Sequence, residues 1–290
     1  MSYDIPKNEI DKNIIVYKNK YRLKSFIKLP KSKIKIPKYR KLEKVLVFDL
    51  DETIGSFHDM ILLWNFIEGP KDQKTFDTIL DLYPEFLRYG ILQILRYIIN
   101  KKTTGKCSKL YMYTNNIYSP ELPNMISIYL QHKLNCETIL FDKLILAFKV
   151  NNNIIEPMRT TNKKTYNDLI RCTLIPDTTE ICFIDDNYYE KMNNEKVYYI
   201  QPAPYYHSLS VDEIIERFLK LNLINNSNLN DLYDILKYDR YIKNENDKDM
   251  NKKIFQKIMY YVKDFFYLSE DKIKTRKIKV RIGNFTRKKL

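Results

Sequence analysis

The stretch KVLVFDLDET, residues 44–53, decides the fold, because an apolar run stops there at a carboxylate. A second run, ICFI at 181–184, ends in the same way at Asp185 and Asp186. Short runs of β-prone apolar residues are typical of buried parallel strands, so each acid is expected at the carboxyl edge of a sheet. Open α/β sheets bind ligands at that edge. Carboxylates that converge there repel one another unless a cation lies among them, which indicates a site for a divalent metal.

The segment from 44 to 200 alternates between strand-like and helix-like patterns. Beyond the two runs above, the expected strands are 110–113 and 197–200, with short strands at 138–141 and 145–148, and the expected helices are 86–100, 121–133 and 164–172. This alternation predicts an α/β fold with a parallel sheet and helices on both faces. The mixed segment 54–80 indicates a small cap or a helical excursion.

Two amphipathic patterns follow the expected sheet. Ser210 and Glu213 form a capping box that begins one helix, and apolar residues at helical spacing predict another near 252–267. We therefore divide the chain into a basic, extended amino-terminal arm (1–40), an α/β domain (41–222), a helical extension (223–270) and a basic carboxy-terminal tail (271–290). The stretch 222–231 is polar and rich in asparagine, and no element is predicted there.

The net charge of +14 is concentrated at the two ends of the 290-residue chain. Residues 1–44 carry +10 and residues 272–290 carry +9, so the segment between them carries −5. Basic ends indicate an anionic partner, such as nucleic acid, a phosphorylated protein or an acidic surface. AT-rich coding, which enriches Lys, Asn and Ile along a whole chain, explains the same composition without a partner.

The composition argues against several classes of protein. Glycine occurs only five times and no glycine-rich nucleotide-binding motif is present. The four cysteines, at 107, 136, 172 and 182, lack metal-ligand spacing and indicate a reducing compartment. No signal peptide and no apolar run near 18 residues is found. We therefore expect an intracellular protein, cytoplasmic or nuclear, that is neither secreted nor membrane-bound.

Four motifs resemble, in their order along the chain, those of the haloacid dehalogenase superfamily of phosphatases. They are DLDET at 49–53, YTN at 113–115, Lys163 or Lys164, and Asp185-Asp186. With Arg88-Tyr89-Gly90 before a helix, the chain more narrowly resembles the branch that acts on the RNA polymerase II carboxy-terminal domain and similar phosphoproteins. The resemblance covers about 44–220 and implies a Rossmann-like core with a small cap or none.

The chain departs from that branch at several positions. Tyr89 stands where the branch usually has proline, and Thr114-Asn115-Asn116 stands where Thr-Ala-Ser is more common. The fourth motif reads Asp-Asp, which suits the larger members rather than the small ones. These differences bear on the identity of the substrate more than on hydrolysis.

The resemblance implies a role for each motif residue. Asp49 is expected as the nucleophile that forms an aspartyl-phosphate, and Asp51 as general acid and then general base. Lys164 is preferred over Lys163 because it opens the periodic stretch that follows, and it is expected to neutralise phosphoryl oxygens. The expected phosphate contacts are Thr53 (which can also fix its loop), Thr114, Asn115 and Lys164, and the expected Mg²⁺ ligands are Asp49, Asp51, Asp185 and Asp186.

Other polar residues are not expected in the site. Arg159 is interpreted as an exposed loop residue, and Asp142 is placed outside the site although it follows an apolar triplet. The three histidines, His58, His132 and His207, show no pairing pattern and are interpreted as surface or packing residues.

The spacing of the motifs bears on the substrate. The gap of 60 residues between Thr53 and Thr114 and the gap of 49 between Thr114 and Lys164 leave no room for a large lid. An open site suits a macromolecular substrate whose own surface excludes water, so we expect phosphoserine or phosphothreonine in a flexible protein segment. Two alternatives remain: a polynucleotide end phosphatase whose basic ends bind nucleic acid, and a non-catalytic binding module tethered by those ends.

Overall fold

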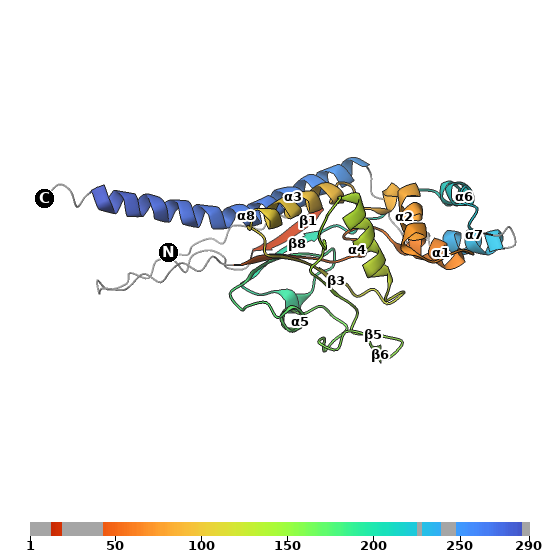
Figure 1. The fold of residues 1–290 in the computed structure, drawn as a ribbon, viewed down its shortest axis with the longest axis horizontal. Helices are drawn as coiled ribbons and strands as arrows, with labels where there is room; N and C mark the ends of the chain where they lie inside the picture. Colours follow the sequence, from red (N-terminus) through yellow and green to blue (C-terminus); the bar gives the residue numbers. More distant parts are fainter. Residues whose placement is uncertain (1–12, 19–42, 225–227, 239–247, 286–290) are drawn as a thin grey trace.

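The structure, a computed structural model, describes residues 13–18, 43–224, 228–238 and 248–285. Its centre is a six-stranded sheet in the order β1-β8-β7-β2-β3-β4 (Figure 1). The strands are β1 (Ile14–Lys18), β2 (Lys44–Phe48), β3 (Lys109–Tyr113), β4 (Lys143–Ile145), β7 (Glu180–Ile184) and β8 (Val197–Pro202), and β5 (Lys149–Val150) pairs with β6 (Asn153–Ile154) in a separate hairpin. All pairs in the large sheet are parallel except β1 with β8. The predicted α/β fold is confirmed.

Helices cover both faces of the sheet, but unequally. They are α1 (His58–Phe66), α2 (Gln73–Leu82), α3 (Ile91–Thr103), α4 (Leu122–Lys133), α5 (Tyr166–Thr173), α6 (Val211–Leu219), α7 (Leu229–Tyr238) and α8 (Lys248–Phe285). Leu46 and Phe48 of β2 point into the larger core, with residues of α3, α4 and α8. Val45 and Val47 point into the smaller one, with residues of α5. Because both faces are buried, β2 is apolar without alternation.

Residues 14–18 lie inside the stretch interpreted as an arm, yet they form the edge strand β1. The register pairs Ile14 with Pro202 and Tyr17 with Tyr199. Ile14 is buried in the larger core, and the ring of Tyr17 packs against those of Tyr188 and Tyr199. The alternation of Lys and Ile predicts extended backbone, but the strand it pairs with is encoded far away in the chain. The rest of the predicted arm, 1–12 and 19–40, lies outside the described residues.

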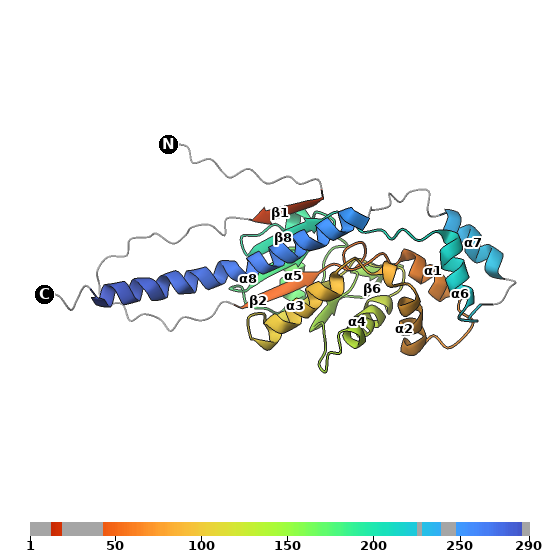
Figure 2. The ribbon, with the colours of Figure 1, turned by 90° about the horizontal axis from the view of Figure 1, so that it is seen from above.

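Four helices, α1, α2, α6 and α7, pack against one another beyond the carboxyl edge of the sheet (Figure 2). The first two lie between β2 and α3, in the segment where the sequence predicts a small cap or a helical excursion. Helix α7 was not predicted, because its apolar residues follow an asparagine-rich stretch. It buries Leu232 and Leu236 against the rest of this group. Of this group, α1 contributes His58 and Ile61 to the lining of a cavity at the sheet edge.

Helix α8 lies along one face of the sheet and continues away from it (Figures 1 and 2). It is longer than the predicted 252–267 and runs past the expected boundary at 270, while 286–290 lie outside the described residues. Lys44 of β2 binds it, since its ammonium donates to the carbonyl of Phe265 and lies 3.2 Å from Glu180. Within the described ranges, no helix combines the length and the apolar character needed to cross a membrane.

Candidate functional site

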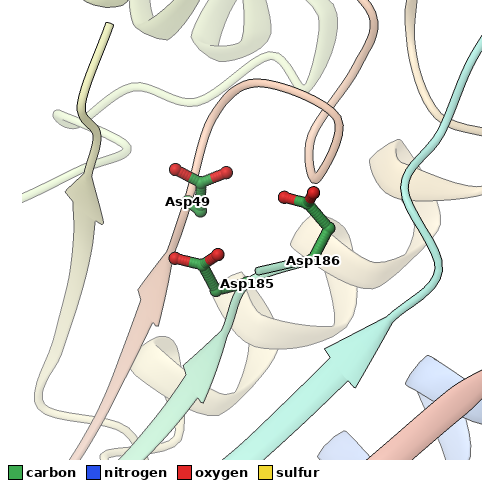
Figure 3. A group of neighbouring side chains, drawn as sticks. All are labelled: Asp49, Asp185 and Asp186. Atoms are coloured by element: carbon green, nitrogen blue, oxygen red, sulfur yellow. The ribbon is translucent and has the colours of Figure 1, made fainter. Parts of the chain in front are cut away.

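The strand register places the two acidic motifs side by side. Phe48 of β2 pairs with Ile184 of β7, and the amide of Asp49 donates to the carbonyl of Ile184 at 2.9 Å. The next residues, Asp49 and Asp185, are therefore neighbours. Figure 3 shows Asp49, Asp185 and Asp186 with their carboxylates turned toward a common space. One oxygen from each lies within 4.8 Å of the others, and all three residues are buried.

Lys164 brings a buried cation to these acids. Its ammonium contacts Asp49 and lies 2.7 Å from Asp185, and the side chain is 1% exposed. The residue after it, Thr165, caps α5 by accepting from the amide of Asp168 at 3.0 Å, which fixes the backbone at this point. Lys163 is exposed. The sequence favours Lys164 only slightly over Lys163 as the lysine of the third motif. In the structure, Lys164 is the one that lies among the acids.

The three acids are arranged to hold a cation. Burial, with the nearby charge of Asp49, raises the pKa of Asp185 well above its ordinary value and that of Asp186 to about 7. Burial alone would lower the pKa of Lys164, but Asp185 and Asp49 outweigh it and raise that pKa. One lysine is too little charge for three buried carboxylates, and a divalent ion would relieve the remainder. The oxygen donors of this triad fit Mg²⁺.

Asp51 lies apart from the triad. Its carboxylate accepts two hydrogen bonds from the amide of Asn116, at 3.0 and 3.1 Å. Burial, with the charge of Asp49, raises the pKa of Asp51 to about 6. The resemblance implies that Asp51 contributes to the metal site through its main chain, and among the described residues its carboxylate is not one of the grouped acids. The two motif aspartates thus have different surroundings, as a nucleophile and a proton donor would need.

The predicted phosphate contacts divide into two groups. Asn115 lines the cavity, and its amide donates to the hydroxyl of Tyr189 at 3.1 Å. Thr53 is buried, and its hydroxyl donates to Asp186 and accepts from the amide of Asp186, both at 3.0 Å. Thr114 is buried as well, and its hydroxyl accepts from the amide of Asn116 at 2.9 Å. The hydroxyl of Thr53 therefore links two loops, whereas that of Thr114 binds within its own loop.

Two buried arginines hold these loops from behind. Arg88 donates to the carbonyls of Thr53 at 2.6 Å and Ala203 at 2.8 Å, and also to that of Glu52. Arg159 donates to the carbonyl of Thr114 at 3.0 Å and to the side-chain oxygen of Asn115 at 2.7 Å. The prediction of an exposed Arg159 is wrong, since the residue is 2% exposed. The sequence around it carries no signal for this burial, because two of its acceptors, Thr114 and Asn115, lie on a distant loop.

A cavity of about 460 Å³ opens over the acids. Its lining comprises Asp49, Asp51, Glu52, His58, Ile61, Asn115, Asn116, Ile117, Tyr118, Lys164, Asn187, Tyr189 and Tyr206. The sequence did not point to His58, Tyr189 or Tyr206 as site residues, because no motif contains them. The other histidines pair with acids elsewhere, His132 with Asp77 at 2.7 Å and His207 with Asp59 at 3.0 Å.

Comparisons of this chain with known protein families, with curated proteins and with solved structures found no match. What the structure defines is an α/β domain with a mostly parallel six-stranded sheet and a buried acidic triad at its carboxyl edge. This triad is a candidate metal site. Its location follows from the strand register, independently of any relative.

Proposed function

We propose that this protein is a Mg²⁺-dependent phosphatase that hydrolyses phosphoserine or phosphothreonine in protein segments through an aspartyl-phosphate on Asp49. One observation carries the proposal: Asp49, Lys164 and the Asp185-Asp186 pair converge at one sheet edge, with Asp51 on the same cavity. The order of these motifs along the chain resembles that of haloacid dehalogenase phosphatases, which supports the same reaction.

In the first half of the reaction, one oxygen of Asp49 attacks phosphorus and the bond to the substrate oxygen breaks. Lys164 contacts Oδ1 of Asp49, which orients the carboxylate and leaves Oδ2 for the attack. The leaving oxygen takes a proton from Asp51, whose pKa of about 6 keeps part of the population protonated near neutral pH. A Mg²⁺ ion held by the triad would neutralise charge on the phosphoryl oxygens.

In the second half, water attacks the phosphorus of the aspartyl-phosphate and restores the carboxylate of Asp49. Asp51, which lost its proton in the first half, accepts one from this water. Asn116 holds the carboxylate of Asp51 in place during both proton transfers, through its two hydrogen bonds. Phosphate then leaves through the cavity.

The mouth of the cavity supports a macromolecular substrate. Ile117 and Tyr118 stand at its rim with 57% and 68% of their surface exposed. Exposed apolar side chains beside a site are surfaces that a protein segment can cover. The bound protein segment would then exclude water from the cavity. This agrees with the short gaps between the sequence motifs, which leave no room for a large lid.

An assay with an aryl phosphate and Mg²⁺ tests the phosphatase activity. We expect Asp49→Asn to lower kcat by about 10³-fold or more, because the nucleophile is lost. Asp177→Asn is the matched control, since Asp177 is exposed and does not line the cavity. Equal rates in the wild type and Asp49→Asn would exclude the enzyme and leave the non-catalytic module.

The basic ends of the chain favour a second candidate, a polynucleotide end phosphatase. Residues 1–44 carry +10 and residues 272–290 carry +9, charges that nucleic acid would neutralise. Deleting 272–290, which leaves strand β1 (Ile14–Lys18) in place, should strongly reduce turnover of phosphorylated oligonucleotides under this candidate. If the substrate is a protein, the same deletion should leave phosphopeptide turnover largely intact.

A further inference from the structure

A second hollow adjoins the cavity over the acids. It has a volume of about 360 Å³ and lies between α1 and the loop that leads into α4. Ile61 and Tyr118 line both hollows, so the two share a wall that is formed by these side chains. The ring of Tyr118 is braced edge-on by His58 at 5.9 Å, on the side of the acids. The two hollows are thus adjacent, with Ile61 and Tyr118 between them, and together we call them the groove.

The second hollow has a mixed lining, in which apolar and aromatic side chains outnumber the polar ones. Its apolar lining is Ile61, Trp64, Tyr118, Pro120, Leu122 and Met125. The polar lining, Asn65, Lys71, Ser119 and Glu121, includes one cation and one anion. Trp64 is half-buried, and its ring stands edge-on to Phe76 of α2 at 5.4 Å. Such a lining suits an apolar side chain of the size of leucine or phenylalanine.

The start of α4 does not make this hollow an anion site. The amide of Leu122 donates to the carbonyl of Ser119 at 3.3 Å, and the amide of Asn124 donates to that of Glu121 at 3.0 Å. Pro123, between them, has no amide hydrogen. Because the first amides of the helix are already bonded, the helix offers no donor to a phosphate or carboxylate. The hollow is therefore suited to an uncharged group.

The charge along the groove favours a peptide over a polynucleotide. Of the described residues that line the two hollows, the lysines are Lys164, which is buried against Asp49 and Asp185, and Lys71. Acidic residues of the same lining include Asp51, Glu52 and Glu121. A chain of phosphodiesters needs a basic track, and this groove does not supply one. An extended peptide needs only apolar contact and hydrogen bonds.

We propose that the second hollow is a specificity subsite, which binds a large apolar side chain of the phosphoprotein substrate near the phosphorylated residue. The inference rests on the proposed phosphatase function and names what that site selects. Since an extended chain advances about 3.3 Å per residue and the hollows share one wall, the apolar residue lies within about four positions of the phosphoserine. The phosphoryl group occupies the acidic cavity, and the apolar side chain crosses Tyr118 to contact Trp64.

Trp64 gives a direct reading of this contact, because it is the single tryptophan of the chain. We would titrate the inactive Asp49→Asn protein, with Mg²⁺, with phosphoserine peptides that carry Leu or Phe at each of the four positions on either side. Matched peptides carry Ala instead. We expect a saturable change in Trp64 emission with Leu or Phe at one favoured position, and affinity weaker by about 10- to 100-fold with Ala there. A phosphorylated oligonucleotide is the parallel ligand, and a change produced by it alone would overturn the proposal.

A matched pair of variants tests the hollow through turnover. Asn65→Tyr fills the hollow from its rim, and Asn124→Tyr makes the same change at an exposed position of α4 outside the lining. The readout is the ratio of kcat/KM for the Leu peptide to that for the Ala peptide. We expect this ratio to be about 10 or more in the wild type and in Asn124→Tyr, and to approach 1 in Asn65→Tyr.

The outcomes separate this inference from the proposed function. Turnover of all peptides at equal rates, with no change in Trp64 emission, would overturn the subsite and leave the phosphatase intact. Saturable Trp64 emission changes that depend on the Leu position, without hydrolysis of any substrate, would support peptide binding in the hollow and overturn the catalytic proposal. If Asn65→Tyr keeps the wild-type ratio of kcat/KM between the Leu and Ala peptides, the selectivity does not come from the second hollow, and the proposed subsite is wrong.

Discussion

Two buried cations contact the segment after β2, and their partners differ. Lys164 contacts the carboxylates of Asp49 and Asp185. Arg88 donates to main-chain carbonyls, among them those of Thr53 and Ala203. The pKa of Lys164 is raised because the carboxylates outweigh burial, whereas burial lowers the pKa of Arg88 to about 10.

This difference in partners indicates that the two cations have different roles, one in the proposed reaction and one in holding the backbone. A cation among carboxylates changes the charge that a substrate meets, so we assign Lys164 a part in the proposed reaction. A guanidinium that binds carbonyls fixes the path of the backbone, so Arg88 belongs to the scaffold. The loop it holds includes Glu52, which adopts a positive φ of 55° that an L-residue rarely takes. The predictions below test whether the two roles are as separate as the contacts indicate.

Replacing Lys164 should have the largest effect. We expect Lys164→Met to lower kcat/KM toward an aryl phosphate by about 10²- to 10³-fold, because the phosphoryl oxygens and Asp49 lose their cation. The metal-free variant should also lose roughly 3 kcal/mol or more of unfolding free energy at pH 8, since it leaves the buried carboxylates unpaired. Lys163→Met is the control at the exposed neighbouring position. Rates and urea unfolding curves measure both effects, and wild-type rates in Lys164→Met would remove it from the mechanism.

Replacing Arg88 should affect stability more than chemistry. We expect Arg88→Met to lower the free energy of unfolding by about 2–4 kcal/mol, because the buried carbonyls of Glu52, Thr53 and Ala203 lose their donor. Turnover per folded molecule should fall less than in Lys164→Met. Arg96→Met, at an exposed position of α3, is the control. If Arg88→Met unfolds like the wild type but loses all activity, the separation of roles is wrong.

The stability of the metal-free protein should depend on pH, because the pKa values of the clustered acids are raised. The pKa values of Asp186 (about 7) and Asp51 (about 6) lie above the ordinary 3.8, so between pH 4 and 7 the folded protein holds more protons than the unfolded chain. The free energy of unfolding therefore falls as the pH rises through this window. We expect Tm in EDTA to drop by several degrees from pH 5 to pH 8. Mg²⁺ should restore Tm, more at pH 8 than at pH 6, and a Tm in EDTA that rises with pH would contradict the arrangement.

Removing the partner of Asp51 should have the smallest effect. The hydrogen bonds from Asn116 lower the pKa of Asp51, against the larger effect of burial. Asn116→Ala should raise that pKa, so the alkaline limb of the pH profile of kcat should move up by about one pH unit or less. Asn124→Ala, outside the cavity, should leave the limb in place. A shift toward lower pH would argue that Asp51 is not the proton donor.

The sequence predicted those parts of the site that lie on regular strands. Runs that stop at Asp49 and Asp185 specify both the strand and the edge at which the acid appears, since parallel strands share one carboxyl edge. The α/β fold followed from the same alternation of strand and helix patterns. Lys164 could be preferred over Lys163 because a helix begins just after it. Local pattern was sufficient here because each residue acts at an element boundary.

The remaining features depend on contacts between distant segments. Arg159 binds a carbonyl 45 residues earlier in the chain, and no local pattern announces such a partner. Strand β1 pairs with β8, almost two hundred positions away, although its own composition resembles that of the basic segments around it. The hydroxyl of Thr53 binds Asp186, 133 residues later, which placed this threonine behind the cavity. Side-chain partners of this kind are set by packing, and a pattern of residue types does not encode them.

The anchoring of α8 has a consequence for how the protein is made. Lys44 is buried in β2, but one of its acceptors, the carbonyl of Phe265, lies 221 residues later in the chain. A growing chain on the ribosome therefore lacks this contact of its central strand until residue 265 has been added. We expect chains that stop at 247 to be cleaved by protease much faster than the full chain, and equal resistance would show that the domain matures before its last helix arrives.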